Sequence, residues 1–225
     1  MFSRQEVKAA AKSAMKMQRS TAILLQVVFI AISLVFGIIL GIAEVTLGEV
    51  VYWILYTLWM LVIYVLAIHL IGEHIKISKG VGASVGALFT EFSVNFLRKL
   101  GGMLWMSLWV TLWSLLLIIP GIIKSFSYYF TANILADCPH VTARQALKIS
   151  MRITDGHKMA IFVWSLSWLG WMLLSGLTLG LLWVFYVGPY YFTADAGLYL
   201  KLRAQALEKG VITYEELGMT PPPVQ

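Results

Sequence analysis

TAILLQVVFIAISLVFGIILGIA, residues 21–43, contains no charged side chain along its whole length. A helix that crosses a bilayer needs about 20 mostly apolar residues, because the hydrocarbon core is about 30 Å thick. Gly41-Ile42-Ala43 loosely resembles a signal-peptide cleavage site. The apolar stretch, however, is longer than the roughly 7–15 residues of a typical signal-peptide core. We therefore predict a membrane-spanning helix here, with a cleaved signal peptide as the weaker alternative.

The composition of the whole chain agrees with a membrane location. Of its 225 residues, 60% are hydrophobic and only 12% are charged, whereas a soluble domain carries about 25% charged residues. A soluble core of this size has too little interior to bury so many apolar side chains. The net charge of +6 would suggest nucleic acid for a soluble protein, but on the flanks of membrane helices it indicates contact with anionic lipid. We expect no nucleic-acid partner, and the single cysteine, Cys138, excludes an internal disulfide.

Further apolar segments predict an all-α fold, a polytopic bundle of about six spans in a single transmembrane domain over residues 21–203. The fourth segment is short and polar, so it alternatively continues the third helix after a kink or re-enters the membrane without crossing. Pro120 and Gly121 are predicted to break the helix before it, and Pro189 to interrupt the last segment. The five spans predicted after the first are residues 51–71, 102–119, 122–136, 160–177 and 180–200.

The distribution of basic residues predicts the orientation of these spans. With six spans and a cytosolic N-terminus, every Lys and Arg except Lys124 falls on the cytosolic side, while Glu44 and Glu49 lie outside. Both termini are therefore expected in the cytosol. A reporter cysteine between the third and fourth spans should label from outside, and one near Arg144 should not.

The cytosolic segments are predicted to be amphipathic helices. In residues 1–20, Ser3 and Glu6 have the spacing of a capping box, and basic residues recur every four positions from Lys8. Residues 84–98 carry apolar side chains at helical spacing, and in the segment that Thr142 caps, Arg144, Lys148 and Arg152 form a basic stripe. We expect these basic faces to meet anionic headgroups of membrane lipids. The tail, residues 204–225, is predicted to be cytosolic and disordered at its end, where three prolines follow one another.

A short repeat indicates a possible internal duplication. The string YYFTA occurs at 128–132 and again at 190–194, followed by Asn133 and Asp195 respectively. An amphipathic helix, a span, a turn and a second span accompany each copy. Duplicated units are common in membrane transport folds, although chance similarity is the alternative in so aromatic a sequence.

Asp195 is the main candidate for a functional polar group. A charge at the centre of a bilayer costs at least about 2.5 kcal/mol and usually faces a partner or a water-filled cavity. Asp195 is predicted either to bind a cation or proton, or to have a structural partner such as Lys201, Arg203 or Asn133. The candidate intramembrane polar site comprises Asp195, Asn133, Thr131, Thr193, Tyr190 and Tyr128.

No pattern in the sequence indicates catalysis, a cofactor or a metal. His69 and His74 are five residues apart, about 140° around a helix, so they do not share one face as the histidines of a zinc helix do. Trp105, Trp109 and Trp113 follow a four-residue spacing. That spacing predicts lipid-facing or packing aromatics, with an aromatic ligand cage as the minority alternative.

Several motifs, taken in order, resemble a family of bacterial integral membrane proteins of unknown function, domain-of-unknown-function family nine-seven-five. The resemblance covers most of the chain and implies a multi-span protein of the bacterial plasma membrane. It implies no reaction, ligand or catalytic residue. The motifs are Pro120-Gly121-Ile122-Ile123-Lys124, Ala136-Asp137 with Pro139, Ala146, Ser150-Met151, Gly156-His157-Lys158, Trp171, Pro189-Tyr190 and Tyr199.

The expected function is accordingly broad. We expect a non-enzymatic plasma-membrane protein that handles a small ligand, lipid or peptide in transport or envelope protection. The alternative is an accessory or scaffold protein that binds another membrane complex, with a membrane-protein partner or a homo-oligomer. An intramembrane enzyme is the least supported class.

Overall fold

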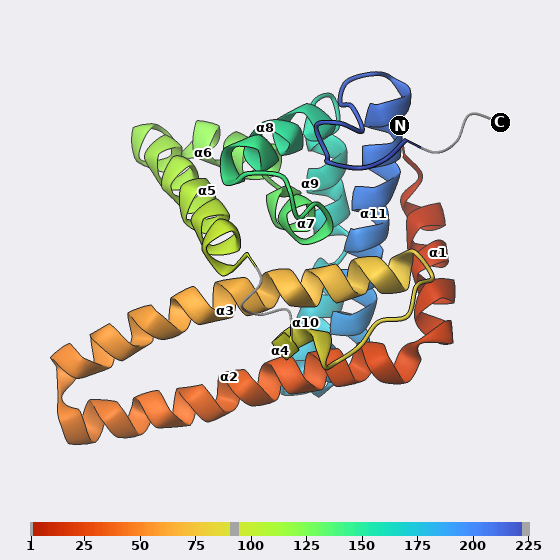
Figure 1. The fold of residues 1–225 in the computed structure, drawn as a ribbon. Helices are drawn as coiled ribbons and strands as arrows, with labels where there is room; N and C mark the ends of the chain where they lie inside the picture. The colour runs from red at the N-terminus through yellow and green to blue at the C-terminus, as the bar shows by residue number, and fades with distance from the viewer. Residues whose placement is uncertain (1, 91–94, 222–225) are drawn as a thin grey trace.

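The computed structural model describes residues 2–90 and 95–221, and within these ranges the chain forms helices and no strands. This confirms the predicted all-α fold (Figure 1). The helices, in chain order, are α1 (Arg4–Met17), α2 (Arg19–Leu47), α3 (Glu49–Ser78), α4 (Ala87–Thr90), α5 (Phe96–Leu116), α6 (Ile118–Ser127), α7 (Thr131–Asp137), α8 (Ala143–Thr154), α9 (Lys158–Leu166), α10 (Leu169–Leu177), the π-helix η1 (Trp183–Val187) and α11 (Gly188–Glu208).

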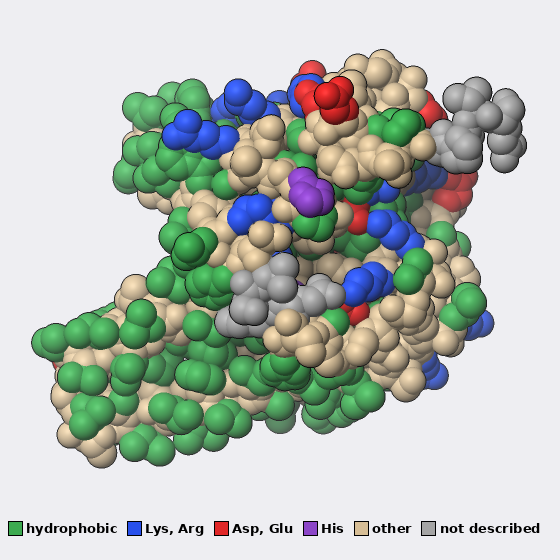
Figure 2. All heavy atoms as spheres, in the orientation of Figure 1, with side chains coloured by type: hydrophobic (Ala, Val, Ile, Leu, Met, Phe, Trp, Pro, Cys, Tyr) green, Lys and Arg blue, Asp and Glu red, His purple; other side chains and the backbone are tan. Residues whose placement is uncertain are grey.

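The two longest helices form a hairpin that projects from the rest of the molecule. α2 and α3 lie side by side and turn at Gly48, whose φ of 85° favours glycine (Figure 1). At the tip, Val45 is 86% exposed and Val50 is 74% exposed, and hydrophobic side chains cover the hairpin in Figure 2. In the described residues, three stretches are long and apolar enough to cross a membrane: α2, α3 and Lys158–Leu177. The structure thus supports membrane helices without establishing six spans.

The amphipathic N-terminal helix packs on protein. Ser3 caps α1, because its Oγ accepts a hydrogen bond from the Glu6 backbone N–H at 3.4 Å. Val7, Ala11 and Met15 are buried on one face, and the neighbours of α1 are α11 and α3. The apolar face of α1 is therefore covered by other helices, and the exposed face is the basic one.

The turn between α5 and α6 lies earlier than predicted. Leu117 has extended backbone angles (φ −158°, ψ 135°), so the helix breaks there. Pro120 and Gly121 instead lie in the first turn of α6, where proline is tolerated because its missing N–H has no helical partner anyway. Gly121 allows close approach of the two helices, since a Cβ atom there would lie 2.8 Å from Cα of Ser114.

The last predicted spans are also divided. Residues 122–136 belong to two short helices, α6 and α7, and α9 is separated from α10 at Ser167. Pro189 is the second residue of α11 and follows the π-helix η1, so the irregularity precedes the proline. Of the predicted helix 84–98, α4 and the start of α5 are present, and residues 91–94 lie outside the described part. The predicted disordered end, 222–225, lies outside it as well, whereas Ile212 and Leu217 of the tail are buried.

Candidate functional site

The Asp195 carboxyl lies where α7, α9 and α11 meet. Tyr129 Oη donates a hydrogen bond to Oδ1 of Asp195 at 2.7 Å. The indole of Trp164 and the amide of Asn133 lie beside the same carboxyl, and their buried N–H groups form no hydrogen bond of ordinary geometry. Buried donors without another partner favour a fixed carboxylate. This arrangement indicates a structural junction that holds three helices together.

The structure brings together only part of the predicted polar site. Asp195 and Asn133 are neighbours, and Tyr129 occupies the position expected for Tyr128. The Tyr129–Asp195 bond joins the two YYFTA copies directly. The remaining predicted members lie elsewhere. Thr193 Oγ1 is 3.0 Å from Nδ1 of His74, and the Tyr190 hydroxyl donates to the carbonyl of Lys8. Tyr128 is the cap residue at the end of α6, and the Thr131 hydroxyl is buried with no hydrogen-bond partner.

A second charged junction was not predicted. The buried carboxylate of Asp137, at the end of α7, forms ion pairs with Lys79, the cap residue that follows α3, and with Arg203 of α11. Tyr199 Oη donates to the same carboxylate at 3.2 Å. These residues are far apart in the chain, so no spacing rule links them. The only sequence signal was that Ala136-Asp137 belongs to the family resemblance.

Arg98 completes the polar centre. Its guanidinium donates to the carbonyls of Leu135 and Val141, each at 2.7 Å, and to that of Cys138 at 3.2 Å. It therefore satisfies carbonyl groups at the C-terminal end of α7, from Leu135 and the cap residue Cys138, and that of Val141 in the loop before α8. Like the two aspartates, Arg98 has neighbours that account for its position without a ligand.

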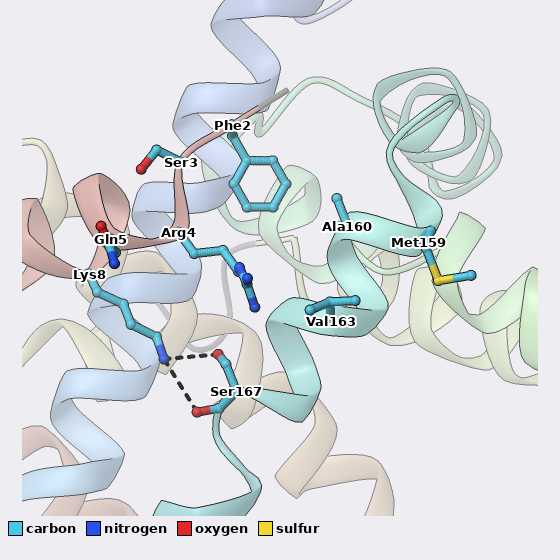
Figure 3. Close-up of a pocket in the computed structure, with 9 residues that line it drawn as sticks. All are labelled: Phe2, Ser3, Arg4, Gln5, Lys8, Met159, Ala160, Val163 and Ser167. Atoms are coloured by element: carbon cyan, nitrogen blue, oxygen red, sulfur yellow. Dashed lines mark hydrogen bonds between the residues drawn. The ribbon is translucent and has the colours of Figure 1, made fainter.

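A pocket of about 650 Å³ separates α1 from α9. Figure 3 shows Arg4 and Lys8 extending from α1 into the space that faces Ala160 and Val163 of α9. Lys8 Nζ donates to Oγ of Ser167 at 2.8 Å and lies 4.3 Å from the ring centre of Trp168. The lining residues are Phe2, Ser3, Arg4, Gln5, Lys8, Met159, Ala160, Val163 and Ser167.

The two cations of this pocket are not neutralised by protein. Among the described residues, no carboxylate lies within ion-pair distance of Arg4 or Lys8; the nearby Glu6 pairs with Lys201. Burial, with the positive charge of Arg4 as a second cause, lowers the pKa of Lys8 from its ordinary value. An anion bound in the pocket relieves both effects, because it replaces lost hydration and offsets the repulsion.

Chemically, the pocket combines a cationic edge with an apolar wall. Phe2, Met159, Ala160 and Val163 supply the apolar surface. The residues suited to acid, base or metal chemistry are placed elsewhere: in the described part, no three His, Cys, Asp or Glu side chains are grouped closely enough to hold a metal. His69 and His74 contact Lys99 and Thr193 respectively.

Residues 107–206 match the model of a family described as "Protein of unknown function (DUF975)". The match begins within α5 and ends within α11, and it confirms the resemblance predicted from the sequence. No curated protein and no solved structure matches the chain.

Proposed function

Because the family model that residues 107–206 match has no known function, we propose a function from the geometry of the molecule itself. The protein is an integral membrane protein that binds an anionic amphiphile in the pocket between α1 and α9, without catalysing a reaction. The observation that carries this proposal is the pair of unneutralised cations, Arg4 and Lys8, beside an apolar wall.

The proposed membrane arrangement uses the three long apolar stretches of the described residues, α2, α3 and α9–α10, and adds η1–α11 as a fourth, less apolar crossing. α2, α3, α9–α10 and η1–α11 cross the bacterial plasma membrane, and both termini lie in the cytosol. A helix of 30 residues such as α3 is about 45 Å long, so it fits a core of about 30 Å when it is tilted. Six spans would also require the α5 and α6–α7 segments to cross. That pair has the least support, because α6 has ten residues and a rise of only about 15 Å.

The ligand class follows from the pocket. A phosphate or carboxylate accepts charge-assisted hydrogen bonds from a guanidinium and an ammonium group, and an acyl chain packs on the apolar side chains. A phospholipid with a net negative charge has both parts. The lining contains no His, Cys, Asp or Glu. Ser167 Oγ accepts a hydrogen bond from Lys8 and donates one to the Trp164 carbonyl at 2.6 Å. Neither partner is a general base that could activate the Ser167 hydroxyl. This supports binding rather than catalysis.

The test compares lipid binding by charge-matched variants. The whole chain is purified in neutral detergent and exposed to phosphatidylglycerol and phosphatidylcholine, and the lipid retained per chain is measured by native mass spectrometry. In the double variant Arg4→Gln/Lys8→Gln, we expect affinity for phosphatidylglycerol to fall about tenfold or more, because each lost charged contact is worth about 1.5–3 kcal/mol.

The matched control is Lys12→Gln/Lys16→Gln. It makes the same change of charge on the exposed face of the same helix and should retain nearly wild-type affinity. Equal losses in both double variants would show a diffuse charge effect and contradict a pocket. Constant co-purification of one membrane protein, with no preference for anionic lipid, would instead favour the scaffold class.

A further inference from the structure

A second groove, of about 500 Å³, runs along α5 between α6 and α8. Trp105, Trp109 and Trp113 recur along α5 with the spacing of one helical turn and line its floor. Lys124 and Tyr128 border it from the α6 side, and Arg144, Leu147, Lys148 and Met151 border it from α8.

The cations of this groove lie against the aromatic rings. Arg144 Cζ is 5.0 Å from the ring centre of Trp105, and Lys124 Nζ is 5.1 Å from that of Trp113. Lys148 completes a group of three positive charges. In the described part of the chain, none of the three has a carboxylate within ion-pair distance. The groove therefore favours an anionic group next to an apolar body.

The tip of the hairpin formed by α5 and α6 indicates that the apolar part of the ligand is lipid. Leu115 is 79% exposed, Ile118 is 74% exposed and Ile119 is 71% exposed. They immediately follow the row of tryptophans on α5, Trp105, Trp109 and Trp113, which we call the tryptophan ladder. Tryptophan, lysine and arginine beside a strongly apolar segment are typical of the boundary between headgroups and acyl chains. The tip is suited to acyl chains and the groove to the headgroups above them.

The helix α8 fixes the depth of the groove. It packs along α5 and α6, and its sequence ARQALKISMRIT carries three basic residues, Arg144, Lys148 and Arg152, over 12 positions. Placing these charges in hydrocarbon would be very costly. Since α8 borders the tryptophan ladder, α5 lies near the membrane surface over that length. Lys124 and Arg144 then lie on the same side of the membrane, whereas six spans would place them near opposite sides.

We propose that α5, α6 and α8 form a binding groove for the headgroup of an anionic phospholipid in the cytosolic leaflet, with the α5–α6 tip inserted among the acyl chains. The hairpin enters this leaflet and returns to the cytosolic side. The proposal rests on the membrane location proposed above, but the groove shares no residue with the α1–α9 pocket. The two sites therefore fail or succeed independently.

The first experiment uses the same lipid assay with a different double variant. Arg144→Gln/Lys148→Gln changes two exposed side chains of α8 and should lower the affinity of one phosphatidylglycerol site about tenfold. The site lost with Arg4→Gln/Lys8→Gln should remain occupied. Lys12→Gln/Lys16→Gln again serves as the charge-matched control.

Three outcomes of this assay overturn the proposal. They are unchanged phosphatidylglycerol retention in the Arg144→Gln/Lys148→Gln variant, a loss no larger than that of the control, and equal retention of phosphatidylcholine by the wild type. Competition separates a lipid from a free phosphate. Glycerol phosphate that displaces phosphatidylglycerol at comparable concentration would show a site for a soluble anion and would also overturn the lipid assignment.

The second experiment locates the hairpin tip. An Ile119→Cys chain in intact cells should resist a membrane-impermeant maleimide applied from outside, since the tip lies in the cytosolic leaflet. After unfolding in detergent, the variant should take up two maleimides per chain and the wild type one, because Cys138 also reacts then; the second maleimide confirms that the added thiol is present. Labelling from outside in intact cells would show that the hairpin crosses the membrane and would overturn its proposed depth.

Discussion

At the residue scale, the polar centre depends on single carboxylates that each join several helices. Asp137 is the clearest case, because it pairs with cations at the end of α3 and in α11 and accepts a hydrogen bond from Tyr199. Its side chain is only 5% exposed. Removing one member of a buried ionic group leaves the others without compensation, which costs more than the group contributes as a whole.

The substitution Asp137→Asn should therefore destabilise the protein by about 3 kcal/mol. The loss appears as a lower midpoint of thermal unfolding in detergent, followed by near-ultraviolet circular dichroism. Asp155→Asn is the matched control, because that carboxylate is 82% exposed and lies 3.9 Å from Lys158. Its effect should stay within about 0.5 kcal/mol. Equal midpoints for the two variants would contradict the role assigned to Asp137.

At the element scale, local signals were predictable and distant pairings were not. Ser3 and Thr142 cap α1 and α8, because a capping motif is complete within four residues. Pro120 was ambiguous, since proline fits both a turn and the first turn of a helix. The partners of Asp137 and the ring of Tyr129 beside Asp195 depend on how α3, α7 and α11 pack, which no local spacing specifies.

The α5–α6 hairpin should be sensitive to any side chain at Gly121. Alanine there places Cβ against the backbone of Ser114, at 2.8 Å from its Cα, so the two helices must separate. We expect Gly121→Ala to lower the free energy of unfolding by about 1–3 kcal/mol. The control, Gly101→Ala in α5, meets no atom within 4 Å and should be neutral or stabilising by up to about 1 kcal/mol. A stable Gly121→Ala variant would contradict this close packing.

At the scale of the whole molecule, Cys138 makes the topology directly measurable. This single cysteine has no exposed surface. Burial, with the negative charge of Asp137 as the second cause, raises the pKa of its thiol to about 11. Thiolate is the reactive form, so very little is present near neutral pH. The folded wild-type chain should not react with maleimide until it is unfolded or the pH approaches that pKa.

Reporter cysteines can therefore be added to the natural sequence. Thr46→Cys at the α2–α3 tip and Leu177→Cys at the end of α10 are exposed positions and should label from outside in intact cells. Ser13→Cys on α1 should label only after the membrane is permeabilised. Labelling of Ser13→Cys from outside, or protection of Thr46→Cys, would reverse the proposed orientation.

The contact between α1 and α11 also sets an order of assembly. Lys201 of α11 donates to Glu6 of α1 at 2.8 Å, and Tyr190 donates to the carbonyl of Lys8. During translation, α1 emerges from the ribosome long before α11 is synthesised. The apolar face of α1 therefore has no α11 to pack against during that time. The α1–α9 pocket reaches its final form only when the last helix has been inserted. A nascent chain arrested before α11 would therefore carry the basic helix but not the finished lipid site, so ligand occupancy would report completed biogenesis.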